Sequence, residues 1–443
     1  MHLLLLLAAA ARAAPTYRTD AELRAEYGPP VPLPPPRYLT ASPLRAGAPT
    51  TLRAAAAARG LFVGAAINEA CWVNASEPYA STYLAELDLA TCENGCKFAA
   101  LEPQQGAFNF QECDFISQKA LVDGKGAFRG HNFVWGEGIP SWVANGGFSP
   151  SALRGVMEGH ISAALAHYAG SPPPFECWDV VNEAVCDTGS KAFNCSSPQT
   201  LWKTNTWTPA GAGAAGGYVE LAFAAAARGA RGGEKLFYND YGGEAAGTTK
   251  SDKIYAMLRD FKQRGVPVSG VGLQMHISVD GYPSPWDVAA NIKRLGELGL
   301  EVHITEMDVR CSGCSDARLQ LQAAVYGHML QACLNNSGVC RSFETWGFTD
   351  RHTWLSDFDN PTHEDVMPLP WDVVRAGGGA GKHWGPGVGA TPPHTHTHTH
   401  STQHKRAHTT KPRTEAPLTP LFHAPQNYLK KPAYHELLAV LNA

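Results

Sequence analysis

The sequence predicts a fold of the α/β class, a single (β/α)8 TIM barrel. Eight short apolar segments recur between residues 60 and 346, and stretches of helical character lie between several of them. Nearly every apolar segment ends in polar or aromatic residues, as barrel strands do at the face where active sites lie. The 443 residues suffice for one such barrel, which runs to about 250–400 residues with insertions.

The chain begins with segments that we expect to lie outside the barrel. Residues 3–11 are apolar and short, and Ala11 and Ala13 suit a cleavage site, so residues 1–14 are predicted to be a signal peptide. This segment is too short to span a bilayer, which needs about 20 apolar residues. Residues 15–55 are rich in Pro, Ala and Arg, which predicts a linker or extended arm. The catalytic domain is expected to cover residues 56–443.

The predicted strands are short, apolar and separated by turn or helical residues. They are Leu61–Ile67, Leu89–Thr91, Ala127–Val134, Cys177–Val181, Lys235–Tyr238, Gly270–Met275, Glu301–Thr305 and Ser342–Trp346. Helices are expected at Tyr218–Arg228, Ser251–Arg264 and Lys431–Leu441. This alternation predicts a parallel inner sheet with helices outside it.

Residues 373–424 break the pattern and contain a His-Thr repeat. The stretch holds six Lys or Arg, one Glu and eight of the 18 histidines, without apolar periodicity, so it is predicted to be a disordered insertion. A retained intron is the favoured explanation, and a real insertion in the loop after the last strand is the alternative. Alternating histidines can also bind Zn²⁺ or Cu²⁺, but a segment without fixed geometry makes a poor metal site.

Charge and cysteine content limit the function and the compartment. The net charge of −4 argues against nucleic acid as a partner, and no later stretch looks transmembrane. Eleven cysteines and sequons at Asn74, Asn194 and Asn335 suit a secreted, extracellular or cell-wall glycoprotein. The expected bridges join Cys92 or Cys96 with Cys113, Cys186 with Cys195, and Cys333 with Cys340, while Cys311-Ser-Gly-Cys314 lacks the further ligands of a metal site.

Two glutamates follow predicted strands and suit a pair of catalytic carboxyl groups. Glu183 ends the fourth strand segment and Glu306 ends the seventh, so both should face the barrel mouth. Glycoside hydrolysis uses one carboxyl group as a proton donor and an ionised one as the nucleophile. Either residue alone could instead be a buried, ion-paired carboxylate.

Other residues at the strand ends would support these two. Asn182 is placed to bind a sugar hydroxyl, and His276 with Asp308 can position Glu306 and keep it ionised. Sugar rings pack on aromatic planes, which makes the following residues candidates for a polysaccharide cleft: Trp135, Tyr241, Trp346 and Trp354. Each could equally be an ordinary core or rim aromatic.

An ordered set of motifs resembles glycoside hydrolase family 10, the endo-β-1,4-xylanases. The matching runs are Glu93-Asn-x-x-Lys97, Glu102-Pro-x-x-Gly-x-Phe-Asn-Phe110, Arg129-Gly-His-Asn-x-x-Trp135, Trp178-Asp-Val-Val-Asn-Glu183, Tyr238-Asn-Asp-Tyr241, Gly272-Leu-Gln-x-His276, Thr305-Glu306-x-Asp308, Trp346-Gly-x-x-Asp350 and Pro432-Ala-Tyr434. The resemblance covers residues 60–372 and 425–442.

The resemblance implies a retaining mechanism without a cofactor, with Glu183 as acid/base and Glu306 as nucleophile. Gln274 and His276 would surround the nucleophile, and Tyr241 would line the far side of the cut. Trp346 and Trp354 would form the wall of the central subsites. The sugars on the non-reducing side would be bound by Glu93, Asn94, Lys97, His131 and Trp135.

The chain departs from the family pattern at three positions. Gly136 and Gly138 stand where many members have His and Gln, which removes polar contacts on the non-reducing side. Phe98 replaces a common Trp, a change that should affect packing more than chemistry. We therefore also consider a catalytically silent xylan-binding barrel and an active glycosidase for another β-1,4-glycan. In each case we expect a monomer that contacts neither nucleic acid nor membrane.

Overall fold

The computed structural model describes residues 18–40, 47–75, 77–170, 175–185, 217–230, 233–355, 366–372 and 428–443. Within them, eight parallel strands form a closed barrel in the order β1-β2-β3-β4-β5-β6-β8-β9. The strands are β1 (Phe62–Ile67), β2 (Leu89–Cys92), β3 (Ala127–Trp135), β4 (Cys177–Asn182), β5 (Lys235–Asp240), β6 (Gly270–Leu273), β7 (His276–Ser278), β8 (Glu301–Arg310), β9 (Cys340–Thr345), β10 (Trp371–Asp372) and β11 (Leu429–Lys430). The predicted barrel is confirmed.

The predicted sixth strand is divided into β6 and β7. Gly270–Leu273 pairs with both β5 and β8, whereas β7 pairs only with β8, at His276↔Asp308. Gln274 and Met275 interrupt the strand, and Met275 has a φ of 66°, which leaves the extended region. The interruption lies at the barrel mouth and moves His276 out of the sheet that β6 forms.

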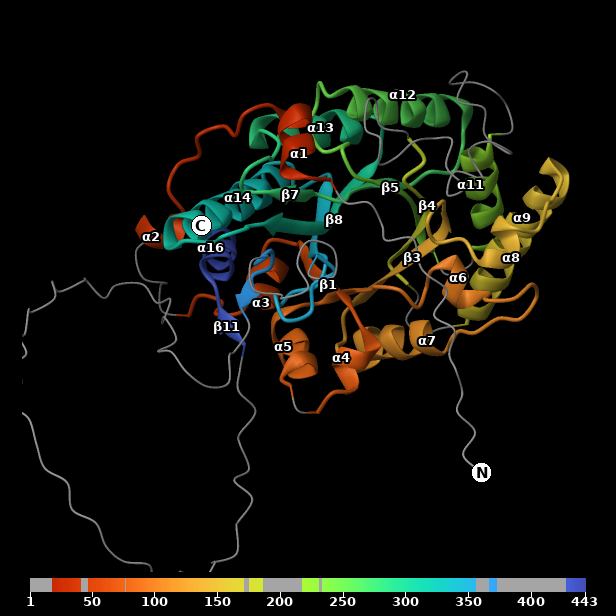
Figure 1. Cartoon of the computed structure of the whole chain (residues 1–443), viewed down its shortest axis with the longest axis horizontal. Helices are drawn as coiled ribbons and strands as arrows, with labels where there is room; N and C mark the ends of the chain where they lie inside the picture. Colours follow the sequence, from red (N-terminus) through yellow and green to blue (C-terminus); the bar gives the residue numbers. More distant parts are fainter. Residues whose placement is uncertain are drawn as a thin grey trace, which may run out of the picture.

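Helices surround the barrel and bury the outward faces of the strands (Figure 1). They are α1 (Asp20–Tyr27), α2 (Arg37–Thr40), α3 (Leu52–Ala57), α4 (Glu69–Val73), α5 (Tyr79–Glu86), α6 (Phe98–Leu101), α7 (Gln111–Gln118), the π-helix η1 (Lys119–Asp123), α8 (Ser141–Ala144), α9 (Pro150–Tyr168), α11 (Tyr218–Gly229), α12 (Thr249–Arg264), α13 (Pro285–Glu297), α14 (Asp316–Leu334) and α16 (Pro432–Leu441). The helices predicted at residues 218–228, 251–264 and 431–441 are confirmed as α11, α12 and α16 within a few residues.

The segment expected to be a linker or extended arm contains three helices in its described part. Thr19 and Glu22 form a capping box at the start of α1, and Leu23 of this helix is buried against the barrel. The backbone N–H of Tyr38 in α2 donates to Glu436 Oε2 of α16 at 2.9 Å. Residues 18–40 therefore follow the barrel surface as a docked arm.

The chain on either side of the predicted insertion meets in a small antiparallel ladder. Trp371 of β10 pairs with Lys430 of β11, and Asp372 pairs with Leu429. Lys431, directly after β11, is buried and donates to Asp350 Oδ2 at 2.8 Å. The two ends of the interrupted segment thus lie side by side.

Three disulfides are present in the described residues. Cys96 rather than Cys92 pairs with Cys113, and Cys333 pairs with Cys340, as predicted. Cys311 pairs with Cys314, and both cysteines of the expected Cys186 and Cys195 pair lie outside the described residues. No helix of the described part has the length and apolar character needed to cross a membrane.

Candidate active site

The two candidate catalytic glutamates face each other across the barrel mouth. Glu183 directly follows β4, where a φ of 57° turns the chain out of the strand, and its backbone N–H donates to the carbonyl oxygen of Asn239 at 2.9 Å. Glu306 lies within β8, and its backbone N–H donates to the carbonyl oxygen of Gln274 at 3.1 Å. Both side chains thus start from backbone that is fixed by the sheet.

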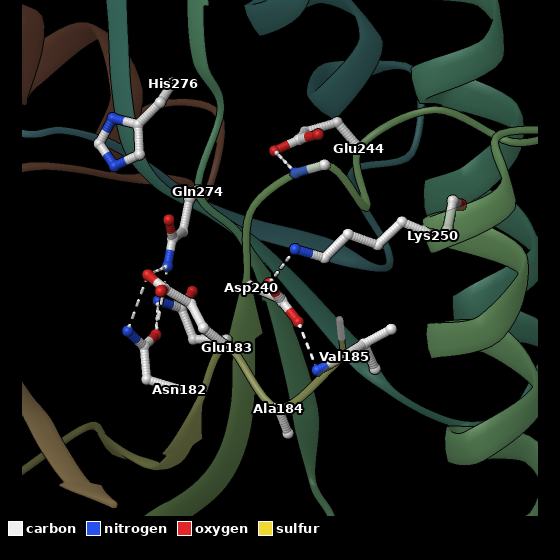
Figure 2. Close-up of polar contacts among 12 residues, drawn as sticks. Asn182, Glu183, Ala184, Val185, Asp240, Glu244, Lys250, Gln274 and His276 are labelled. Carbon is white, nitrogen blue, oxygen red and sulfur yellow. Dashed lines mark hydrogen bonds and ion pairs between the residues drawn. The ribbon is translucent and has the colours of Figure 1, made fainter. Parts of the chain in front are cut away.

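Three donors surround the carboxyl group of Glu183. Trp135 Nε1 donates to Oε2 at 2.8 Å, while Gln274 Nε2 and Asn182 Nδ2 donate to Oε1 at 2.9 and 3.1 Å. Figure 2 shows Asn182, at the end of β4, and Gln274, directly after β6, converging on this carboxyl group. Glu183 remains partly exposed, so a substrate can reach it.

Glu306 is almost fully buried and is bound by an imidazole and an amide. His276 Nε2 lies 3.1 Å from Oε2, and Asn239 Nδ2 donates to Oε1 at 2.6 Å. The other ring nitrogen of His276 lies 2.8 Å from Asp308 Oδ2, which also accepts from Trp354 Nε1 at 2.8 Å. The predicted His276 and Asp308 pair is therefore present beside Glu306.

This arrangement sets the protonation of both groups. Burial alone would lower the pKa of His276, but the charge of Asp308 and the hydrogen bonds of both carboxylates raise it to about 10. Burial alone would raise the pKa of Glu306, but the His276 bond, the nearby His131 and the Asn239 bond lower it below its usual value. At neutral pH the site thus holds an imidazolium between two carboxylates, with Glu306 ionised.

Two amide side chains connect the carboxyl groups. Asn239 Nδ2 donates to Glu306 and also to Asn182 Oδ1 at 2.8 Å, and Asn182 in turn donates to Glu183. Thr305 Oγ1 fixes the Asn239 amide by donating to its Oδ1 at 2.8 Å. This chain of bonds links the two carboxyl groups and fixes their relative positions.

The residues expected to bind non-reducing-side sugars lie on the same face. Lys97 Nζ lies 5.0 Å from the ring centroid of Trp135 and 5.9 Å from that of Trp346, and it donates to Asn94 Oδ1 at 3.0 Å. The rings of His131 and Trp346 are 5.2 Å apart in an edge contact. Asn68, which follows β1, donates to Glu93 Oε2 at 3.3 Å. Aromatic and charged side chains thus alternate along this wall.

A layer of buried charges lies beneath the site. Asp179 accepts from His131 Nδ1 at 2.9 Å and pairs with Arg129 Nη1 at 2.7 Å. Arg129 also pairs with Glu344 at 3.2 Å, and its side chain and those of both acids are at most 1% exposed. This layer fixes His131 from below.

A second buried carboxylate, Asp240, lies behind Glu183. Its side chain pairs with Lys250 Nζ at 2.9 Å and accepts from the backbone N–H of Val185 at 3.4 Å (Figure 2). Burial raises the pKa of Asp240 to about 6, opposed by Lys250 and assisted by the charge of Glu183. Asp240 thereby anchors Val185, two residues after the candidate acid.

Two positions, Tyr241 and Gly138, affect the aromatic residues of the cleft in ways that the sequence did not indicate. Tyr241 lies at the barrel mouth, yet only 6% of it is exposed, and Lys250 Nζ lies 3.3 Å from its ring centroid. A side chain at Gly138 would start 3.0 Å from the Trp135 ring, so the glycine allows that ring its present position.

Three residues of the site had no role assigned from the sequence. Asn239 was visible as a polar residue at a strand end, but only the structure shows that it bonds both Asn182 and Glu306. Asn68 and Asp179 lie in segments whose other residues are apolar or aromatic, and no spacing rule indicated their partners. In the described part of the chain, no group of three His, Cys, Asp or Glu side chains is placed to hold a metal ion, and the His-Thr repeat lies outside that part.

The chain is similar in sequence to known glycoside hydrolases. The sequence profile of glycosyl hydrolase family 10 matches residues 51–375. Endo-1,4-beta-xylanase B of Neocallimastix patriciarum is 36% identical over 269 residues, which is 60% of this chain and 28% of that protein. Endo-1,4-beta-xylanase B of Thermotoga neapolitana is 31% identical over 316 residues, covering 69% of this chain and 83% of that protein.

A solved structure shares the architecture. Xylanase 10B of Thermotoga petrophila in complex with xylobiose has a TM-score of 0.64 and 30% sequence identity, over 73% of this chain and 92% of that one. The match with the Neocallimastix enzyme, in contrast, spans little more than a quarter of that protein's length, at 28%.

Proposed function

The chain belongs to glycosyl hydrolase family 10, and we propose that it is a retaining endo-β-1,4-xylanase acting by double displacement. The observation that carries this proposal is the link between the two glutamates through Asn182 and Asn239. Retaining glycosidases hold their carboxyl groups about 5–5.5 Å apart, with one as nucleophile and the other as proton donor. The bonded amides hold both carboxyl groups at fixed positions on one face of the barrel, as a paired nucleophile and proton donor require.

In the first step, Glu306 attacks the anomeric carbon while Glu183 gives its proton to the leaving oxygen. The bond from carbon to the leaving oxygen breaks as the ester bond to Glu306 forms. His276 and Asn239 favour the ionised form of Glu306 before the attack. Trp135, Asn182 and Gln274 hold the Glu183 carboxyl group in place.

In the second step, water replaces Glu306 at the anomeric carbon. Glu183, now without its proton, accepts one from the water, whose oxygen attacks the anomeric carbon from the face opposite the bond to Glu306. The carboxylate of Glu306 leaves with the bonding electron pair. Two inversions give a product with the original β configuration.

Xylan is the proposed substrate because the wall of the site combines aromatic planes with a few polar groups. Trp135 and Trp354 are partly exposed, and Trp346, which is 7% exposed, lies between His131 and His276. Glu93, Asn94 and Lys97 supply polar groups that can bond hydroxyl groups. Neutral sugars need such stacking faces with polar rims. The relatives with the xylanase name support this choice.

Substitution of each glutamate tests the proposal. Glu183→Ala should lower the hydrolysis of polymeric xylan roughly 100- to 10,000-fold, the range of general acid–base catalysis, and Glu306→Ala should abolish it. The matched control is Glu158→Ala, because Glu158 pairs with Arg154 on the surface of α9. Reducing-sugar release from xylan and from cellulose separates a xylanase from a silent barrel and from a glycosidase for another glycan.

The two glutamate variants should also differ from each other. An aryl β-xylobioside with a good leaving group needs little acid assistance, so Glu183→Ala should still form the glycosyl-enzyme, and azide should convert it to a β-glycosyl azide. Glu306→Ala should give no such product. An α-anomer as the first product of the wild type, detected by NMR, would contradict the retaining mechanism.

We also propose that the protein is secreted to the extracellular space or the cell wall and is a monomer. The predicted signal peptide and the three disulfides support secretion, because disulfides persist in oxidising compartments. Recovery of the protein from the culture medium, starting near residue 14, tests this localisation, and sedimentation tests the oligomeric state.

A further inference from the structure

The N-terminal arm reaches the face of the barrel that carries the proposed active site. Helix α1 packs beside the end of β7, where Leu23 is buried and leaves no room for a side chain at Gly281. Arg310, the last residue of β8, donates to Asp20 Oδ1 at 2.6 Å and to the carbonyl oxygen of Arg18 at 3.2 Å. Arg310 lies two positions after Asp308, so the arm is fixed to the strand that carries the proposed nucleophile.

Arg18 extends from this anchor toward the end of β5. Its guanidinium pairs with Glu26, the last residue but one of α1, and lies 5.1 Å from the ring centroid of Tyr241. Tyr27 donates to Glu244 Oε2 at 2.6 Å, and Glu244 Oε1 accepts from the backbone N–H groups of Gly242 and Met275 at 3.0 and 3.1 Å. In Figure 2, Glu244 and Lys250 lie on the opposite side of Glu183 from Asn182.

These contacts cover Tyr241 with charged side chains. The guanidinium of Arg18 and the Lys250 ammonium group both lie over the ring, and only 6% of the residue is exposed. The arm and Lys250 also enclose the next residue, because a Cβ atom at Gly242 would lie 2.9 Å from Glu26 Oε1 and 3.1 Å from Lys250 Cδ. A sugar ring needs an accessible aromatic face to stack on, and the positions over the Tyr241 ring are occupied by two cationic groups.

We propose that Arg18 is a specificity-determining residue: by covering Tyr241, it closes the aromatic platform on the leaving-group side of the cleft. The enzyme then gains little from sugars placed beyond the cut and cleaves near the reducing end of its substrate. This inference rests on the proposed xylanase function, because it assigns a preference to that same site.

The test measures which bond of xylohexaose is cut, using the full chain and a substrate labelled with ¹⁸O at the reducing end. Arg18→Ala should increase the share of cuts that leave two or more sugars on the leaving-group side. It should also raise kcat/KM for xylohexaose roughly two- to tenfold, the size of one aromatic stacking contact. The matched control is Arg24→Ala, which removes an arginine of α1 that pairs with Asp280 and does not contact Tyr241.

A double-mutant cycle tests whether the covered ring of Tyr241 causes the change in the cleavage pattern. In a Tyr241→Ala background, Arg18→Ala should no longer change the cleavage pattern, because no platform remains to be exposed. Glu26→Ala, at a position that is 23% exposed, frees Arg18 from its partner and should shift the pattern in the same direction, even if Arg18→Ala folds poorly.

An unchanged or reversed pattern in Arg18→Ala and Glu26→Ala, or a shift that persists without Tyr241, would overturn the inference. Hydrolysis of 4-nitrophenyl β-xylobioside serves as the reference, because this substrate places no sugar beyond the cut. A wild type that cleaves neither substrate would contradict the proposed function itself, a result distinct from an unchanged pattern.

Discussion

His276 is the residue on which the charge state of the site depends most directly. It lies between Glu306 and Asp308, and its imidazolium has negative groups on both ring nitrogens. A nucleophilic carboxylate in a buried site needs such a partner, because burial alone favours its neutral form. The same imidazolium stabilises the folded protein: the contribution is fully present below pH 6.5 and is lost as the pH rises through about 10.

We predict that His276→Gln moves the acidic limb of the activity profile to higher pH. Glu306 acts as an anion, and activity falls as the pH drops through its pKa, which His276 helps to lower. Without the imidazolium the pKa of Glu306 rises, so the acidic limb of the activity profile moves to higher pH. The measurement is kcat/KM against pH on an aryl β-xylobioside, with Trp354→Phe as a control that removes a hydrogen bond to Asp308 but no charge. An unmoved limb in His276→Gln would show that His276 does not set the ionisation of Glu306.

Trp135 combines a stacking face with a hydrogen bond to Glu183, and Trp135→Phe separates the two. The variant keeps an aromatic ring but loses the Nε1–H bond of 2.8 Å. A hydrogen bond to a charged group contributes about 1.5–3 kcal/mol, so kcat/KM should fall roughly 10- to 100-fold. Trp142→Phe is the matched control, because Trp142 donates to the carbonyl oxygen of Glu102 outside the site. Equal activities of both variants would refute a role for this bond.

The sequence indicated which positions lie at the candidate site, but it did not indicate which side chains bond to them. The fourteen candidate residues follow barrel strands or neighbouring loops, and the position of strand ends in a barrel is enough to bring them to one face. Partners such as Asn239 and Asp179 depend on which side chains of neighbouring strands meet, and that follows from register and rotamer. Tyr241 shows the same limit, since a residue more than 200 positions away covers it.

At the level of elements, strands were predictable because both faces of a parallel barrel are buried. Continuous apolar runs such as Gly270–Leu273 are the signature of that environment. The division between β6 and β7 was not predictable, because it depends on the positive φ of Met275, a residue type that normally avoids it. β8 extends beyond its predicted C-terminal end for a similar reason, because Asp308 pairs with β7 and not with β6.

The ladder of β10 and β11 makes the intervening segment a candidate for removal. Joining Asp372 directly to Pro425 leaves residues 425–428 between the paired Asp372 and Leu429, a length found in natural hairpin loops. We predict that this deletion of residues 373–424 leaves xylan hydrolysis and the melting temperature close to those of the full chain.

The control for this deletion extends it by six residues, through Lys430. It removes β11 and the Lys430 bond to Glu86, so the melting temperature should fall. Loss of activity in the shorter deletion would mean that the segment has a role in the cleft. Peptides of residues 373–424 in native protein would contradict a retained intron.

At the scale of the whole molecule, the barrel encloses charges as well as apolar side chains. Arg129, Asp179 and Glu344 come from β3, β4 and β9, and all three side chains are buried at the centre. All three residues lie in predicted strand segments, but a single Arg in a strand gives no indication that it has two acidic partners. The docking of the arm on the barrel was not predicted, for a related reason: composition predicts little packing for residues 15–55, whereas contacts such as Asp20 with Arg310 bridge 290 positions.

We predict that Arg129→Met destabilises the whole barrel. The substitution preserves much of the side-chain volume but leaves Asp179 and Glu344 buried without their shared cation. Breaking a buried pair in this way costs about 3–5 kcal/mol, because the remaining charges are not solvated. Arg154→Met is the matched control: Arg154 is 50% exposed and pairs with Glu158 four residues away, so its loss should cost less than about 1 kcal/mol. Urea unfolding at pH 7 measures both. If Arg129→Met is no less stable than Arg154→Met, the charged layer does not hold the barrel together, and its role is confined to positioning His131 beneath the site.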